Sequence, residues 1–252
     1  MLPGRETFAE RSADYASARP TYPAELFAWL ADQVARRELA WDCGTGNGQA
    51  AIGLAPYFAR VHASDRAAEQ VAHGERRANV TYAVHPAEAT PLTDACVDLV
   101  VVAQALHWFD FARFWPEVAR VARTGAYFCA WGYAWFESPP EVDRALVAPL
   151  RELLVPFWAP QNRLVWDGYH EADVAFPFAR EVTPAFEIQV TWTIDHVLAY
   201  LGTWSAYKRS RSDASAARAV DELFARARAA ITPHERLPIR MPLATLAARI
   251  RS

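Results

Sequence analysis

The chain has 252 residues, 52% of them hydrophobic, and a formal net charge of −3. A chain of this length can bury a full core, because the buried share of the surface rises with size, so an intrinsically disordered class is excluded. The charge balance argues against a nucleic-acid partner, since holding a phosphate backbone needs a basic field. The most apolar stretch, residues 97–109, is shorter than the roughly 20 residues that span a bilayer, so we expect no membrane span.

The beginning of the sequence carries charged side chains before any long apolar run, at Arg5, Glu6, Glu10 and Arg11. It therefore lacks the apolar core of a secretory signal, and we expect a cytoplasmic location. The three cysteines lie far apart, without the close pairs of a zinc site or the even count of a disulfide framework. We expect no bound metal, and the sequence does not indicate an oligomeric state.

The first half of the chain alternates helical and strand patterns. A helix is predicted for residues 24–37, where apolar residues recur at helical spacing. Further helices are predicted for residues 49–58, 67–77 and 111–123. Strands are predicted for residues 39–42, 61–64, 80–84, 97–102 and 126–131. This alternation indicates a parallel sheet that helices cover on both faces.

The second half changes in character after Gly132, with many prolines and aromatic residues that indicate a lid or insertion over residues 133–185. Strands are then predicted for residues 186–192 and 237–243, and helices for residues 196–207 and 215–230. The predicted fold class is α/β: a Rossmann-like, doubly wound, mostly parallel seven-stranded sheet with a lid after the fifth strand. We interpret residues 1–252 as one domain, in which residues 1–132 form the core and residues 186–252 complete the sheet.

A glycine-rich segment, Asp-Cys-Gly-Thr-Gly-Asn-Gly (residues 42–48), lies between the first predicted strand and the helix that follows it. Glycines at such a point let the backbone turn sharply and let a ligand lie directly against the main chain. The start of the following helix also offers free N–H groups. The segment therefore predicts a ligand cradle, made of Asp42, Gly44, Thr45, Gly46 and Gly48.

The spacing of the glycines bears on which ligand this cradle holds. A dinucleotide fingerprint, G-x-G-x-x-G, would need a third glycine at the position of Gln49, so that interpretation fails by one residue. A P-loop would need a lysine at its end, and the segment has none. The acid Asp42, just before the glycines, suits a ligand with an ammonium group rather than a pyrophosphate.

A second acid, Asp65, ends the second predicted strand about 20 residues after the glycines. A carboxylate at this point can accept hydrogen bonds from both hydroxyls of an unphosphorylated ribose, which favours an adenosine-type ligand. An aspartate after a strand is also a common turn residue, so both interpretations of Asp65 stay open.

Together these features resemble the class I S-adenosylmethionine-dependent methyltransferases, in which the acid with G-x-G-x-G holds the methionyl part and the second acid holds the ribose. The resemblance covers residues 8–131. Within that class the sequence is similar to the small-molecule, type 11-like group that includes the trans-aconitate methyltransferases. The narrower similarity rests on residues 15–23 (Y-x-x-x-R-P-x-Y-P), 87–92 (Ala-Glu-Ala-Thr-Pro-Leu), 104–110 (Gln-Ala-Leu-His-Trp-Phe-Asp) and 203–207 (Thr-Trp-Ser-Ala-Tyr).

The resemblance implies further cofactor residues. Ala87 and Glu88 would border the adenine, and the backbone of Gln104 would contact the methionyl end. His107 and Trp108 would face the methyl group. Many members have an acid two residues before the glutamate position, where this chain departs from the pattern and has Pro86.

Two residues of the first similar stretch are further candidates for the cofactor. Tyr15 and Arg19 could close over it, with the Arg19 guanidinium pairing a methionyl or substrate carboxylate as a bidentate fork. A plain N-terminal salt bridge of Arg19 is the other interpretation.

On the acceptor side, methyl transfer is an in-line displacement, so the main task of the protein is alignment. A carboxylate acceptor needs no base, whereas a hydroxyl or amine would, and His107 is then the candidate; a purely structural His107 is equally compatible with the sequence. The aromatic residues Trp131, Tyr133 and Trp135 could line the acceptor pocket or pack in the core.

These observations predict an enzyme that uses S-adenosylmethionine to methylate a small organic acceptor, with a carboxylate as one candidate, and that leaves S-adenosylhomocysteine. One alternative is a non-catalytic module or partner subunit that binds S-adenosylmethionine or S-adenosylhomocysteine. A second alternative is an NAD-dependent oxidoreductase, which the missing third glycine disfavours.

Overall fold

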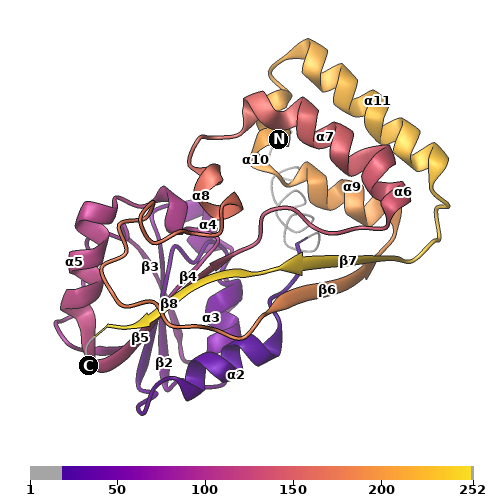
Figure 1. Ribbon diagram of the computed structural model, residues 1–252. Helices are drawn as coiled ribbons and strands as arrows, with labels where there is room; N and C mark the ends of the chain where they lie inside the picture. The colour runs from indigo at the N-terminus through magenta and orange to yellow at the C-terminus, as the bar shows by residue number, and fades with distance from the viewer. Residues whose placement is uncertain (1–18, 251–252) are drawn as a thin grey trace, which may run out of the picture. The chain divides into compact units, whose positions relative to one another are not determined.

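The computed structural model describes residues 19–250, and its main feature is a six-stranded sheet (Figure 1). In spatial order the strands are β3 (Val80–Val84), β2 (Arg60–Asp65), β1 (Leu39–Cys43), β4 (Val97–Ala103), β5 (Ala122–Gly132) and β8 (Ala244–Arg249). The first five are parallel, and β8 pairs antiparallel with β5. The predicted α/β, mostly parallel fold is confirmed.

The strand order reverses between β1 and β4, which are neighbours in the sheet. Chain connections leave these two strands in opposite directions at their carboxyl ends, and such a switch point opens a crevice in which α/β proteins bind ligands. The glycine-rich segment follows β1, and residues 104–108 follow β4. Both predicted site segments therefore start at the switch point.

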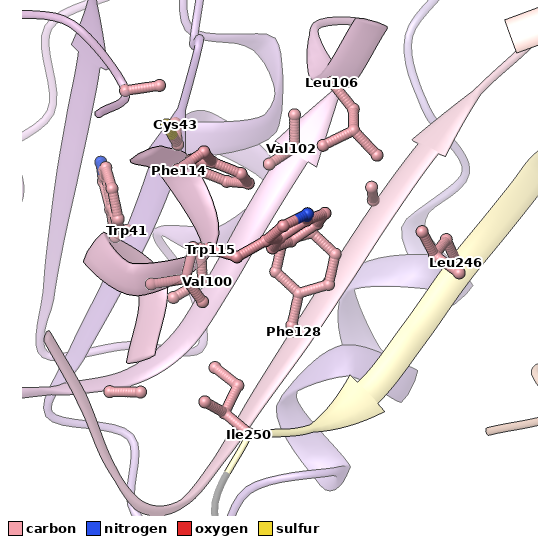
Figure 2. Packing of buried hydrophobic residues seen from close by; sticks show 14 of the residues in the cluster. Trp41, Cys43, Val100, Val102, Leu106, Phe114, Trp115, Phe128, Leu246 and Ile250 are labelled. Carbon is pink, nitrogen blue, oxygen red and sulfur yellow. The ribbon is translucent and has the colours of Figure 1, made fainter. Parts of the chain in front are cut away.

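Helices cover both faces of this sheet. On one face lies α5 (Phe111–Val121), whose Trp115 packs edge-on against Phe128 of β5 at 5.2 Å between ring centroids (Figure 2). On the other face lies α2 (Ala24–Asp32), with Phe27 at 6.3 Å from Trp131. Two further helices, α3 (Gln49–Leu54) and α4 (Ala68–Ala72), and a 3₁₀ turn, Leu106–Trp108, connect strands of this sheet or follow them.

One acid, Asp98, stands inside the buried strand β4 and is only 3% exposed. Its carboxylate accepts from the N–H groups of Glu38 and Leu39 at 2.9 and 3.0 Å and pairs with Arg123 at 2.7 Å. A buried carboxylate is tolerated when its oxygens are bonded in this way. Asp98 thus fixes the entry into β1 beside β4.

The chain divides into two compact units. The unit that contains the six-stranded sheet, here called the sheet unit, comprises Thr21–Ala134, Arg163–Glu187 and the chain from Pro242. The other, here called the helical unit, includes Trp135–Asn162 and Ile188–Met241. Helix α8 (Asn162–Trp166) begins at the boundary between them.

The helical unit pairs two strands, β6 (Glu187–Trp192) and β7 (Leu237–Pro242), with a set of helices. These helices are α6 (Pro140–Val142), α7 (Ala148–Leu154), α9 (Ile194–Gly202), α10 (Ser205–Ser210) and α11 (Ala214–Ala230). A π-helical turn, Asp143–Val147, joins α6 to α7, and a 3₁₀ turn, Val155–Phe157, follows α7. Three tryptophans pack together here, with ring centroids 5.3 to 5.9 Å apart: Trp135, Trp158 and Trp204.

The prediction of a seven-stranded sheet is wrong, because the sheet has six strands and β6 and β7 pair with each other instead. Along β7 buried and exposed side chains alternate, which is typical of an antiparallel pair with one solvated face. The strand that joins the main sheet, β8, has the sequence Ala-Thr-Leu-Ala-Ala-Arg, and alanine has low strand propensity. The assignment of the whole chain to one domain stays a prediction. Within residues 19–250, no helix is long and apolar enough to cross a membrane.

Candidate functional site

The turn after β1 is held tightly against its neighbours. The N–H groups of Gly44 and Thr45 both donate to the carbonyl of Ser64, at 2.8 and 2.9 Å. Gly44 has a φ of +72°, and a Cβ built there would come within 2.6 Å of the Ala105 Cβ. Only glycine therefore allows this turn to approach the segment after β4 so closely.

The middle of the turn is open. Gly46 has a φ of +56°, and the nearest atom to a Cβ built on it is an oxygen of Gln70 at 4.0 Å. Gly48 ends the turn and is the residue before α3. Among residues 19–250, no atom beyond its two chain neighbours therefore comes closer than 4.0 Å to the Cβ position of Gly46, which is compatible with the cradle interpretation.

Asp42, the acid before the glycines, is fully buried. Its Oδ2 accepts a hydrogen bond from the Thr45 hydroxyl. Its Oδ1 is buried and accepts no hydrogen bond of ordinary length and angle within residues 19–250. Burial raises the pKa of the Asp42 carboxyl to about 7, against the lowering effect of Thr45. A cationic group beside Oδ1 would relieve this cost of burial.

Asp65, at the end of β2, is fixed by two backbone groups. Its Oδ2 accepts from the N–H of Gly46 and its Oδ1 from the N–H of Ala67, both at 2.9 Å. Asp65 is thus tied directly to the glycine turn. Because each carboxylate oxygen has two lone pairs, both oxygens can still accept a further hydrogen bond.

The loop after β3 carries two predicted adenine neighbours. Ala87 is 8% exposed and belongs to the apolar cluster on the α5 side of the sheet. Glu88 accepts from the N–H of Asp110, the residue before α5, at 2.9 Å. One oxygen of Glu88 is therefore engaged in joining this loop to the start of α5.

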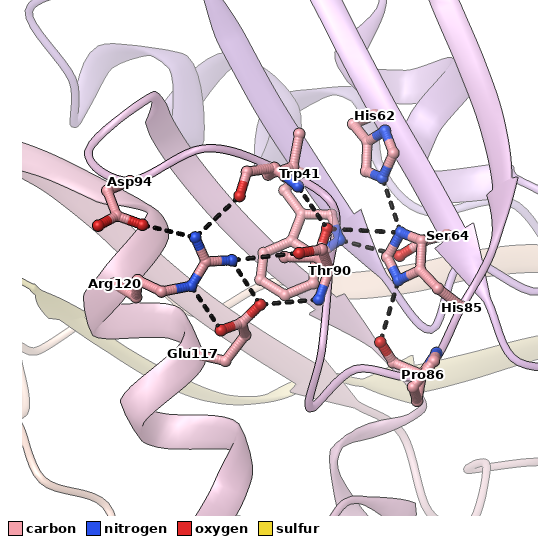
Figure 3. Close-up of polar contacts among 10 residues, drawn as sticks. Trp41, His62, Ser64, His85, Pro86, Thr90, Asp94, Glu117 and Arg120 are labelled. Atoms are coloured by element: carbon pink, nitrogen blue, oxygen red, sulfur yellow. Dashed lines mark hydrogen bonds and ion pairs between the residues drawn. The ribbon is translucent and has the colours of Figure 1, made fainter.

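The same loop is tied to β2 through a histidine pair (Figure 3). The Nε2 atoms of His62 and His85 lie 2.8 Å apart, and the rings stack at 5.1 Å. His85 Nδ1 lies 3.0 Å from the carbonyl of Pro86, which can only accept, so Nδ1 carries the hydrogen. His62 Nε2–H then donates to His85 Nε2. Burial and the neighbouring His85 lower the pKa of His62 to about 4.

The loop after β4 begins with Gln104 in the left-handed region, at a φ of +55°. Its backbone N–H donates to the carbonyl of Trp131 at 2.8 Å, and its side-chain Nε2 donates to the carbonyl of Tyr133 at 2.9 Å. Gln104 therefore holds the carboxyl ends of β4 and β5 together. A strained non-glycine residue of this kind is characteristic of functional sites.

His107 follows on the same loop and is 6% exposed, whereas its neighbour Trp108 is 48% exposed. The Nδ1 of His107 lies 2.9 Å from the hydroxyl of Tyr169. Burial lowers the pKa of His107 to about 4, so the imidazole is neutral at pH 7. The sequence did not indicate Tyr169 as a site residue, because Tyr169 lies in the predicted lid, 62 residues after His107.

The structure brings most of the predicted site residues into the sheet unit, around the ends of β1, β2, β4 and β5. Trp131 and Tyr133 are buried there, and the Trp131 indole N–H has no hydrogen-bond partner within residues 19–250. Trp135 and Arg19 belong to the other unit. Tyr15 lies outside the described residues.

Comparison with known proteins gives the family. The model of the methyltransferase domain matches residues 41–130. A Dictyostelium discoideum protein named as a methyltransferase is 30% identical over 80% of this chain and 78% of its own length. An uncharacterized methyltransferase of Mycobacterium tuberculosis is 33% identical over 81% of this chain and 89% of its own. The chain is an S-adenosylmethionine-dependent methyltransferase.

A solved structure supports the fold of this methyltransferase. A protein of Anaeromyxobacter dehalogenans assigned as a type II methyltransferase is 44% identical, with a TM-score of 0.84 over 92% of this chain and 98% of that one. The methyltransferase domain match starts in β1 and ends in β5, so it spans the glycine turn and the loop after β4.

The close approach at Gly44 predicts that an alanine substitution lowers the free energy of unfolding more at Gly44 than at Gly125. Gly125→Ala should destabilise the methyltransferase by about 1 kcal/mol, because φ is +80° there but a Cβ meets nothing within 4 Å. Gly44→Ala should cost about 2 to 4 kcal/mol, since the contact with Ala105 adds to the cost of φ. Urea unfolding of both variants measures the difference. Equal losses would contradict the close contact.

The lowered pKa of His62 predicts a loss of stability in acid. Between about pH 6.5 and 4 the unfolded chain binds a proton at this histidine that the folded chain excludes, so folding weakens as the pH falls. His62→Gln should flatten the pH dependence, measured as the free energy of unfolding at pH 7 and pH 5. His73→Gln is the control, because His73 is exposed. Parallel pH profiles of wild type and His62→Gln would refute the assignment.

Proposed function

We propose that this methyltransferase transfers a methyl group to a small organic acceptor, as in the small-molecule group that its motifs resemble. The observation that carries the proposal is the meeting of two segments at the switch point. The bare glycine turn after β1 and the loop Gln104 to Trp108 after β4 are in contact through Gly44 and Ala105. We further propose that the enzyme works in the cytoplasm. We also propose that its substrate is not a nucleic acid, and the net charge of −3 supports this second proposal.

The residues at the turn fit the cofactor. S-adenosylmethionine, when bound, supplies a methyl carbon attached to a positively charged sulfur. Asp42 offers the ammonium group a buried oxygen that accepts no hydrogen bond of ordinary length and angle within residues 19–250, and Gly46 places no side chain between the ligand and the turn. Asp65 keeps lone pairs for the two ribose hydroxyls. Thr45 holds the Asp42 carboxylate in place.

The adenine and methionyl contacts are proposed for the loops after β3 and β4. Ala87 and Glu88 would border the adenine ring, and the histidine pair His62 and His85 fixes the loop that carries them. The backbone of Gln104 would contact the methionyl end, and His107 and Trp108 would face the methyl group. We keep Tyr15 and Arg19 as proposed residues of a cover over the cofactor.

Direct titration tests the cradle before the acceptor is known. Isothermal titration with S-adenosylhomocysteine should show micromolar binding, and NAD should show none. Binding of neither compound would mean that the glycine turn is structural. An acceptor screen with small carboxylates, alcohols and amines would then follow from a positive result, with transfer of a labelled methyl group as the readout.

Asp42 predicts a proton release on cofactor binding. At pH 6 the Asp42 carboxyl, with a pKa of about 7, is mostly protonated, and an ammonium group beside it favours ionisation. Binding of S-adenosylhomocysteine should therefore cause the Asp42 carboxyl to release up to about one proton per site. Titration calorimetry in phosphate and in imidazole buffer measures this release as a difference in apparent enthalpy. Asp42→Asn should abolish the difference, and a wild-type enthalpy that is independent of buffer would contradict the role.

Asp65→Ala should weaken S-adenosylhomocysteine binding by at least about tenfold, because it removes both the ribose acceptor and the bond that holds Gly46. Asp94→Ala is the control, since Asp94 is an exposed partner of Arg120. Calorimetric affinity and melting temperature are measured together. Unchanged affinity in a folded Asp65→Ala variant would remove Asp65 from the proposed site.

On the acceptor side, we propose that His107 contacts the acceptor and that Trp131 and Tyr133 line its pocket, with Trp135 as a further candidate. A buried imidazole with a pKa of about 4 is a weak base. An acceptor that arrives without a proton to lose, such as a carboxylate, therefore suits this site better than an alcohol or an ammonium group.

A further inference from the structure

We propose that Tyr169 is a positioning residue that holds the hydrogen of His107 on Nε2, so that His107 presents an N–H donor to the methyl acceptor. This inference rests on the proposed function only for what His107 faces. The arrangement of Tyr169 and His107 themselves comes from their contact and from the backbone around them.

The contact is a hydrogen bond between two buried groups. Tyr169 is 0% exposed and His107 is 6% exposed, and 2.9 Å separate the hydroxyl from Nδ1. Within residues 19–250 the Tyr169 hydroxyl has no other hydrogen bond. Burial holds the pKa of the Tyr169 phenol above its ordinary value, so the phenol keeps its hydrogen at neutral pH.

The direction of this hydrogen bond follows from the phenolic hydrogen of Tyr169, which needs an acceptor because it is buried. If Nδ1–H donated to the hydroxyl, the phenolic hydrogen would be buried without an acceptor among residues 19–250, which costs about 1 to 3 kcal/mol. If the hydroxyl donates to Nδ1, the phenolic hydrogen and the Nδ1 lone pair are both satisfied. Neutral imidazole carries one hydrogen, so that hydrogen is then on Nε2.

Backbone hydrogen bonds hold Tyr169 in place although its φ is unfavourable. The N–H of Gly168 donates to the carbonyl of Val165, and that of Tyr169 donates to the carbonyl of Leu164, the two bonds of a Schellman ending for α8. Tyr169 itself has a φ of +54°, which is strained for an aromatic residue. Strain of this kind persists where the surroundings fix one conformation.

The end of β5 provides the room that Tyr169 needs. A Cβ built on Gly132 would lie 3.2 Å from the Tyr169 ring and 2.7 Å from the side-chain oxygen of Gln104. Gln104 is the other strained residue of the site. Gly132 therefore lets the side chains of two residues with a strained backbone, Gln104 and Tyr169, converge at the carboxyl ends of β4 and β5.

The chemical consequence concerns the acceptor. An imidazole whose Nε2 carries a hydrogen cannot remove a proton through Nε2. It can donate a hydrogen bond to an oxygen of the acceptor and so orient that oxygen for the in-line displacement. The inferred substrate class is therefore one whose reacting group is already unprotonated and is flanked by an oxygen that accepts a hydrogen bond.

The test is nuclear magnetic resonance of the full chain with ¹⁵N-labelled histidine, which distinguishes the two tautomers from long-range couplings. The His107 signals are identified by their loss in His107→Gln. In the wild type we expect the Nε2–H tautomer, and in Tyr169→Phe a loss of this preference. The matched control is Tyr127→Phe, a buried tyrosine whose ring packs against Trp29. An Nδ1–H tautomer in the wild type, or an unchanged tautomer in Tyr169→Phe, would overturn the proposal.

A kinetic comparison then separates a donor from a base. His107→Gln keeps an N–H near the Nε2 position, whereas His107→Asn places its amide near Nδ1. A donor role predicts at least about tenfold higher kcat/KM for the acceptor in His107→Gln than in His107→Asn. Equal, complete loss in both would overturn the donor role. Failure to bind S-adenosylhomocysteine would sink the proposed function but leave the tautomer result standing.

Discussion

The close approach between the turn after β1 and the segment after β4 is the constraint on which the site depends. A Cβ at Gly44 would lie only 2.6 Å from the Ala105 Cβ, which is too close for two carbon atoms. That approach places the buried Asp42 carboxylate and the His107 loop at the same edge of the sheet. The strand order, with β1 next to β4, supplies the edge, and the missing side chain allows the contact.

A second theme is the effect of burial on three titratable side chains. Burial raises the pKa of Asp42 to about 7 and lowers that of His62 and of His107 to about 4. Each shift disfavours the charged form of the buried group. The Asp42 carboxyl, unlike the two imidazoles, therefore titrates close to neutral pH.

The sequence predicted the local parts of this structure and missed the parts that depend on distant contacts. Strands β1 to β5 and the roles of Asp42 and Asp65 as candidates followed from a short motif and from apolar runs. The pairing of β6 with β7 did not, because strand pairing is set by tertiary contacts rather than by propensity. Tyr169 could not be assigned to His107, since no local pattern links residues 62 positions apart. The one local sequence feature at Tyr169 is the preceding Gly168, and a glycine at this place is typical of a helix end.

The antiparallel pairing of β8 with β5 has a consequence for how the chain folds as it is made. The ribosome releases β5 long before β8, because residues 133–243 are encoded between them. Before β8 is present, residues 127–132 of β5, all of them buried in the folded protein, have unpaired N–H and C=O groups along their outer edge. A sheet of β1 to β5 that formed before β8 was synthesised would present this open edge to other chains.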